Sequence, residues 1–175
     1  MKRKMLTILA AALCAGGMAM AAVPDDSIAL GGIVTGMTKA DVEGIYGASE
    51  ELIPYQYVRT TEVYTEKIGY GDSVVVWLTG QSASETPKVD VVVVAANNGF
   101  TTPEGIHVGS TKQEVLDTYG EPDIDYSKYR GNTISPTARK RNRQTLTYKG
   151  ADAFYKVMNF TVENGVVTEI RIGSN

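Results

Sequence analysis

The strongest constraint on the fold is a stretch of sixteen residues that occurs twice in the chain. Residues 32–47 align without a gap against residues 105–120. The two copies share glycine, isoleucine, threonine, lysine, valine and tyrosine at matching positions. Agreement of this kind is typical of an internal duplication. The sequence therefore predicts two copies of one structural module.

Each copy carries the start and stop signals of a short helix. Thr38 stands three residues before Asp41, as Thr111 does before Glu114, which is the spacing of a capping box at a helix N-terminus. Helices of two or three turns are marginal alone in water, so each is expected to pack on a sheet. The apolar stripe and terminating glycine of the two helices are Val42, Ile45, Tyr46 and Gly47, then Val115, Leu116, Tyr119 and Gly120.

The residues behind each helix are rich in valine, threonine and tyrosine and predict strands. Asn164-Gly165 predicts a two-residue hairpin turn, because both turn positions require positive φ. Asn98-Gly99 is interpreted as the corresponding turn of the first copy. The predicted strands are residues 55–64, 73–78 and 88–96 in the first copy and 144–148, 154–162 and 166–172 in the second.

These signals predict an α+β protein made of two tandem modules. Each module is a short helix, or helix pair, followed by a three- to four-stranded antiparallel sheet. The predicted boundaries are residues 28–104 for the first module and residues 105–175 for the second. Because the link between them is short, the modules are expected to pack together. The helices are expected to cover one sheet face and leave the other for a partner.

Residues 1–21 have the parts of a secretory signal peptide: a basic start, an apolar run over residues 5–13, and small residues that end at Ala21. Cleavage is expected after Ala21 or the next alanine. Cys14 is the only cysteine and lies inside this segment. Because Leu13 before it is not a small residue, a lipid anchor is not expected. The mature protein would then have no thiol for a disulfide, a catalytic cysteine or a metal site.

The charge balance argues against nucleic-acid binding. The chain has 17 Lys and Arg against 20 Asp and Glu, and three of the basic residues would leave with the signal peptide. A mature protein with this acidic balance would be repelled by phosphate backbones. After the signal, no segment reaches the about 20 apolar residues that a membrane-spanning helix needs. The expected location is the periplasm or the extracellular space.

Three segments carry a resemblance to known proteins: residues 35–42 with Gly47, residues 108–115 with 119–122, and the closing residues 159–170. They resemble the signature of the SmpA/OmlA (BamE-like) family of small outer-membrane assembly proteins. Two such modules in tandem are also similar to the β-lactamase inhibitory (BLIP-like) proteins, which grip a partner with a concave sheet. The resemblance implies a helix-plus-antiparallel-sheet fold and protein–protein contact without catalysis.

Candidate catalytic residues are few. His107 is the only histidine, and the first copy has Val34 at the same position, so a structural role is predicted. Ser82 follows Gly80 as in a nucleophile elbow, but the second glycine of that motif is missing, and a flexible loop is predicted. A hydrolase that uses a pair of carboxylates stays open as an alternative, as does a carrier of small ligands or lipid. No catalytic residue and no cofactor is predicted.

One segment has metal-like spacing. Asp123, Asp125 and Ser127 are spaced like the first ligands of a calcium loop. Lys128 stands where that loop needs glycine, and Ile134 where it needs a bidentate glutamate. We interpret the segment as a solvated turn and predict no metal site.

Two groups of residues predict a surface that binds another envelope or secreted protein. Tyrosine and tryptophan offer large contact areas with a polar edge. The basic stretch is interpreted as a solvated loop, with a dock for an acidic partner or for anionic lipid headgroups as the alternative. The candidate partner-binding residues are Tyr55, Tyr57, Tyr64, Trp77, Tyr148 and Tyr155, with Arg139, Lys140, Arg141 and Arg143. The sequence thus predicts an exported, non-catalytic protein-binding module of the bacterial cell envelope, similar to an assembly factor or an inhibitor.

Overall fold

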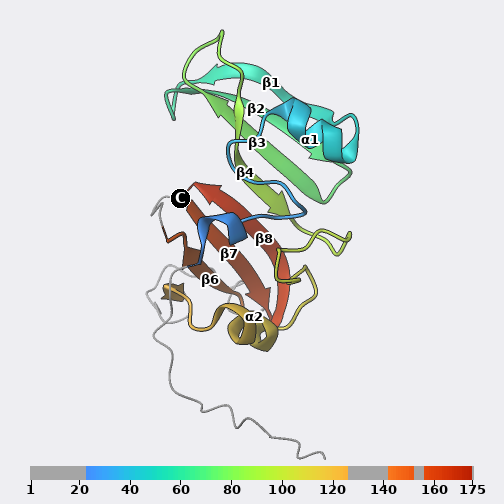
Figure 1. The fold of residues 1–175 in the computed structure, drawn as a ribbon, viewed down its shortest axis with the longest axis vertical. Coiled ribbons are helices and arrows are strands. Elements are labelled where there is room, and N and C mark those ends of the chain that lie inside the picture. The colour runs from blue at the N-terminus through green and yellow to red at the C-terminus, as the bar shows by residue number, and fades with distance from the viewer. Residues whose placement is uncertain (1–22, 126–141, 152–155, 175) are drawn as a thin grey trace, which may run out of the picture.

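The computed structural model describes residues 23–125, 142–151 and 156–174 (Figure 1). Within these ranges eight strands form one antiparallel sheet, with two short α-helices and a 3₁₀ turn. The strands are β1 (Glu50–Val58), β2 (Val63–Tyr70), β3 (Val74–Gly80), β4 (Lys88–Val94), β5 (Ile124–Asp125), β6 (Gln144–Lys149), β7 (Lys156–Glu163) and β8 (Val166–Ser174). The helical elements are η1 (Asp25–Ser27), α1 (Lys39–Tyr46) and α2 (Lys112–Tyr119).

The predicted α+β arrangement of two helix-plus-sheet modules is wrong, because all eight strands belong to one sheet. Their order is β1-β2-β3-β4-β8-β7-β6-β5. The joint between the halves is the antiparallel pair of β4 and β8, with Val91 opposite Gly173 and Val94 opposite Ile170. The repeat could not indicate this joint, since it specifies only what recurs within each copy. The described chain is mostly antiparallel sheet, and the domain boundary at residue 104 stays a prediction.

Both predicted helices form, and each begins with the predicted capping box. The Thr38 hydroxyl accepts the Asp41 N–H at 3.2 Å, and the Asp41 carboxylate accepts the Thr38 N–H at 2.8 Å. Thr111 and Glu114 repeat the two bonds at 3.2 and 2.6 Å. Each helix thereby satisfies backbone donors that its first turn leaves without an intrahelical partner. The residues that follow the two helices are Gly47 (φ 82°) and Gly120 (φ 69°).

The capping boxes should make the protein sensitive to acid. Bonds from Thr38 hold the pKa of the Asp41 carboxyl below its usual range, and bonds from Thr111 do the same for Glu114. A carboxyl whose pKa is lower in the folded state stabilises the fold above its unfolded pKa. That contribution is lost as the pH falls through the folded pKa.

We therefore expect the melting temperature of the wild type to fall more steeply below about pH 4 than that of an Asp41→Asn, Glu114→Gln double variant, which keeps acceptors but cannot titrate. Circular dichroism melts across the acid range measure the slope. Asp72→Asn, in the exposed turn after β2, is the control and should keep the wild-type slope. Equal slopes for the double variant and the wild type would contradict the assignment.

The two halves repeat the same contacts around their helices. Gly36 N–H donates to Val89 of β4 at 2.7 Å, and Gly109 N–H donates to Val167 of β8 at 2.9 Å. Lys39 Nζ on α1 contacts Glu66 Oε1 of β2 at 2.7 Å. The corresponding bond of the second half runs from Lys112 Nζ to Gln144 Oε1 at 2.7 Å. The Tyr70 hydroxyl donates to the Gly47 carbonyl at 3.1 Å in the first half, and the Tyr148 hydroxyl donates to the Gly120 carbonyl at 2.8 Å in the second. The duplication is therefore visible in local packing even though the sheet is continuous.

These matched contacts correct one predicted turn. Asn164-Gly165 joins β7 to β8 with φ values of 52° and 84°, which confirms the predicted hairpin. Since β4 and β8 are equivalent, the corresponding connection in the first half is residues 81–87, and not Asn98-Gly99. The Asn98 amide instead donates to the Ser73 hydroxyl at 2.8 Å, which ties the segment after β4 to the start of β3.

Strand boundaries also differ from the prediction. The predicted strand over residues 55–64 contains the end of β1, a turn, and the start of β2, and Glu62 in that turn has a φ of 59°. Leu52 and Pro54 of β1 fall where the register with β2 shifts. β5 was not expected at all, and the start of the predicted strand at residues 154–162 lies outside the described residues.

The hydrophobic core lies between the helices and one face of the sheet. Val42 of α1 and Val115 of α2 are fully buried, together with Val76, Val92 and Ile170 of the sheet. Figure 1 shows α1 beside the strands of the first half and α2 beside those of the second. Burial of these apolar side chains is what holds helices of only eight residues in place.

Candidate partner-binding groove

Side chains along β3 alternate between the core and the sheet face opposite the helices. Val74, Val76 and Leu78 are buried in the core, so Trp77 and its neighbours Val75 and Thr79 point to the other side. Strand pairing carries this alternation across the joint, because Trp77 is opposite Val91 and Val93 is opposite Arg171. The helix-free face therefore gathers side chains from both halves of the chain.

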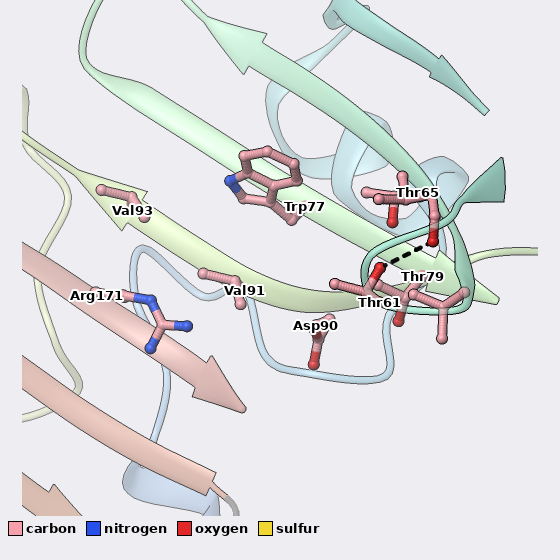
Figure 2. A pocket seen from close by; sticks show the side chains of 10 residues that line it. Thr61, Thr65, Trp77, Thr79, Asp90, Val91, Val93 and Arg171 are labelled. Atoms are coloured by element: carbon pink, nitrogen blue, oxygen red, sulfur yellow. Dashed lines mark hydrogen bonds between the residues drawn. The ribbon is translucent and has the colours of Figure 1, made fainter. Parts of the chain in front are cut away.

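A groove of about 520 Å³ lies on this face. Its floor is formed by Trp77, Val91 and Val93, and Arg171 reaches into it from β8 (Figure 2). The turn between β1 and β2 forms a wall through Val58 and Thr61, whose hydroxyl donates to the Val58 carbonyl at 3.4 Å. Thr65, Thr79 and Asp90 supply the remaining polar lining. The groove falls within the range of about 300–1,000 Å³ that binding pockets occupy.

Two cations border the groove. Lys67 Nζ lies 4.9 Å from the centroid of the Trp77 ring, a cation–π distance. The Arg171 guanidinium donates through Nη2 to the Ser174 carbonyl at 2.8 Å. Among the described residues neither cation forms an ion pair. Asp90 is the one carboxylate in the described lining, and its Oδ1 accepts the Ser174 hydroxyl.

Three of the predicted tyrosines, Tyr55, Tyr57 and Tyr64, lie on the other face from Trp77. Tyr64 precedes Glu66 by two residues on β2, and Glu66 contacts α1, so Tyr64 points to the helix side. Its ring centroid is 5.5 Å from that of Tyr55 and 5.4 Å from that of Tyr57, which is 53% exposed. The Tyr55 hydroxyl donates to the Ser82 carbonyl at 2.8 Å. The single aromatic surface predicted from sequence is thus divided between two faces.

Tyr148 is a core residue, so the prediction that it contacts a partner is corrected. It is 1% exposed, and its hydroxyl donates to the Gly120 carbonyl at the end of α2 at 2.8 Å. The ring contacts Tyr119 and Phe160 at centroid distances of 5.4 and 5.9 Å. Burial raises the pKa of the Tyr148 phenol well above its usual range. A partner could reach this ring only if the core opened.

The basic stretch is described only at its end. Arg143 is exposed, and its Nε lies 3.8 Å from Glu163 Oε1 of β7. An exposed pair at this distance contributes little to stability. Four of the predicted partner-binding residues lie outside the described residues: Arg139, Lys140 and Arg141 of the basic stretch, and Tyr155.

The residues that sequence reasoning missed are Lys67, Val91, Val93 and Arg171. Alternation along residues 166–172 already places Arg171 on the opposite side from Ile170 and Ile172. What was absent was any signal that β8 lies beside β4. Arg171 therefore could not be connected to Trp77 before the strand order was known.

The candidate catalytic residues lie apart from the groove. His107 Nδ1 is 3.2 Å from both the Ser110 hydroxyl and the Gly105 carbonyl, and the His107 N–H donates to the Ser110 hydroxyl at 3.2 Å. These contacts close the turn before α2, and Ser110 is buried. Ser82 lies in the exposed loop after β3, 3.3 Å from the Ser84 hydroxyl.

The candidate calcium segment is partly described. Asp123 Oδ2 accepts the Lys149 N–H at 2.7 Å, which joins the residues after α2 to β6, and Asp125 belongs to β5. Ser127, Lys128 and Ile134 lie outside the described residues. In the ranges that the structure covers, no group of three or more His, Cys, Asp or Glu side chains could hold a metal ion. Nor is any helix there long and apolar enough to cross a membrane.

No protein-family model, curated protein or solved structure matches this chain. The resemblance to the SmpA/OmlA and β-lactamase inhibitory proteins therefore stays a prediction from the repeated motif.

Proposed function

We propose that this chain is an exported, non-catalytic module of the bacterial cell envelope that binds another envelope or secreted protein in the groove. The observation that carries the proposal is Trp77, a half-buried tryptophan on the helix-free face with cations beside it. Tryptophan and arginine are the residues that most often dominate the energy of protein interfaces. The signal-like start and the resemblance of the repeat support the location and the non-catalytic role.

The alternatives have less support. Acid-pair hydrolysis needs two carboxyl groups about 5–9.5 Å apart, whereas the described lining of the groove contributes Asp90 alone. A small-ligand carrier is favoured only by the volume of the groove, which suits a small molecule as well as a protein loop. Protein binding accounts for the tryptophan, the cations and the open shape of the groove together.

The test is photo-crosslinking in intact cells with a photoreactive amino acid at Val93 in the groove and, as control, at Tyr57 on the opposite face. We expect a discrete crosslinked partner from position 93 and none from position 57. Trp77→Thr should weaken the affinity for the purified partner about 30-fold, because losing a central aromatic contact costs about 2 kcal/mol.

Threonine keeps the strand propensity at position 77, so the melting temperature should change little. Calorimetric titration gives the affinity, and Tyr57→Ala is the matched control, for which unchanged affinity is expected. A partner captured from position 57 alone, or undiminished binding by Trp77→Thr, would contradict the groove as the binding site.

A further inference from the structure

We infer that the groove accepts a protruding acidic segment of a partner protein, in which carboxylate side chains flank an aliphatic one. The inference rests on the proposed function and names the chemistry of the occupant. It follows from the charge, the shape and the floor of the groove.

Two cations border the groove, although the chain as a whole is acidic. The chain has a formal net charge of −3, yet Lys67 and Arg171 both border the groove and are half-buried. No described carboxylate forms an ion pair with either cation. Glu169 lies on the same face, two residues before Arg171, without forming one. A carboxylate from outside would pair with these cations, while a basic segment would be repelled.

The negative charge within the groove is already engaged. Asp90 is the extra residue at the irregularity between β3 and β4, since Trp77 pairs with Val91 and Leu78 with Val89. Its Oδ1 accepts the Ser174 hydroxyl, at the end of β8. This bond engages one carboxylate oxygen of Asp90, and the Ser174 carbonyl accepts from Arg171. Asp90 and Arg171 form no ion pair among the described residues, so the Arg171 charge is available to an anion from outside (Figure 2).

The apolar floor of the groove favours a ligand that places an apolar group between its charged groups. Trp77, Val91 and Val93 are half-buried and form a continuous apolar surface across β3 and β4. An aliphatic side chain placed there would remove this surface from water, at about 25 cal/mol for each Å² buried. An acidic segment that carried no apolar residue would leave the floor exposed and would bind weakly.

The shape favours a protein loop over a membrane or an added strand. Val58 and Thr61 line one side of the groove beside its floor, and a protruding loop fits such a concave surface better than a flat bilayer does. Addition of a strand at β1, an outer strand of the sheet, is opposed by Pro54 and by two shifts of register. A protruding loop meets neither obstacle.

The first experiment identifies what the groove selects. A library of disulfide-closed peptides displayed on phage is selected on the wild-type protein and depleted on Trp77→Thr, so that only groove binders remain. We expect aspartate and glutamate, next to leucine, isoleucine or valine, to be enriched above their share in the starting library. Groove binders without acidic enrichment would overturn the inference and leave protein binding by the groove intact.

The second experiment uses one selected peptide, made synthetically. Trp77 is the only tryptophan, so its fluorescence reports occupation of the groove directly. Lys67→Gln and Arg171→Gln should each weaken binding about tenfold, as should aspartate-to-asparagine changes in the peptide. Lys112→Gln removes a cation on α2, on the opposite face from the groove, and should change nothing. Equal affinity for the acidic peptide and its asparagine counterpart would overturn the inference, whatever the stability of the protein variants.

The third experiment separates a protein segment from anionic lipid. Vesicles of phosphatidylglycerol and of phosphatidylcholine are titrated against the wild type, with Trp77 fluorescence as the readout. We expect no change with either. A response to phosphatidylglycerol alone that disappears in Lys67→Gln and Arg171→Gln would make a membrane the occupant and overturn the choice of a protein segment.

Discussion

Gly173→Ala is expected to break the joint between the two halves of the sheet. Gly173 lies on β8 opposite Val91 of β4, with a φ of 135° that residues with a side chain rarely adopt. A Cβ atom there would collide with the Asp90 carbonyl oxygen and lie 2.8 Å from the Val91 Cα. Both obstacles are backbone atoms of the paired strand. They cannot move aside as the end of a flexible side chain could.

We expect this substitution to lower the free energy of unfolding by about 3–5 kcal/mol, since backbone strain and overpacking each cost about 1–3 kcal/mol. Chemical denaturation followed by circular dichroism measures the loss. Gly99→Ala is the matched control: its φ is also positive, at 90°, but no atom lies within 4 Å of the added Cβ. It should lose only about 1–2 kcal/mol, the cost of the left-handed conformation.

The same substitution should also abolish binding in the groove. Trp77 belongs to the first half and Arg171 to the second, and the pair β4–β8 is what places them on one surface. If Gly173→Ala lost no more stability than Gly99→Ala, the pairing of β4 and β8 would tolerate a side chain at position 173. The joint would then not depend on a glycine there. Full peptide affinity in a folded Gly173→Ala protein would show that the groove does not depend on this joint.

The helices could be predicted closely from sequence because their signals are local. A capping box and a terminating glycine act within one turn of backbone, so Thr38 with Gly47 and Thr111 with Gly120 defined two helices that the structure reproduces. The hairpin at Asn164-Gly165 is local in the same sense. Each of these elements is specified by residues that touch one another along the chain.

The joint and the groove could not be predicted, because they depend on pairing between distant strands. The valine run of β4 would suit many neighbours, and nothing in its sequence selects β8. Without that pairing, Arg171 and Trp77 have no common surface. The continuous sheet was missed for the same reason, since the repeat favoured two closed units.

The turn between β1 and β2 was overlooked, so the common face of three tyrosines could not be derived from the sequence. Residues 59–62 contain no glycine, proline or asparagine, so no strong local signal ends β1 before β2 begins. Read as one strand, Tyr55, Tyr57 and Tyr64 cannot all share a face. Folded at the turn, they meet on the helix side, opposite Trp77.

Tyr148→Ala is expected to be among the most destabilising substitutions in the chain, although sequence composition made Tyr148 a surface candidate. Removing a buried aromatic ring leaves a cavity between Tyr119 and Phe160 and costs about 3–5 kcal/mol. Tyr148→Phe keeps the ring and removes only the bond to Gly120, so it should cost about 1–2 kcal/mol, the price of one buried hydrogen bond.

Tyr57→Ala is the matched control, because it removes the same side chain from an exposed position and should cost less than about 1 kcal/mol. Denaturant titrations of the three variants give the comparison. If Tyr148→Ala lost no more free energy of unfolding than Tyr57→Ala, the Tyr148 ring would not support the core. Tyr148 would then again be a candidate for partner contact. The expected order, Tyr148→Ala well below Tyr148→Phe and both below Tyr57→Ala, would instead show that the end of α2 is anchored to the sheet through this side chain.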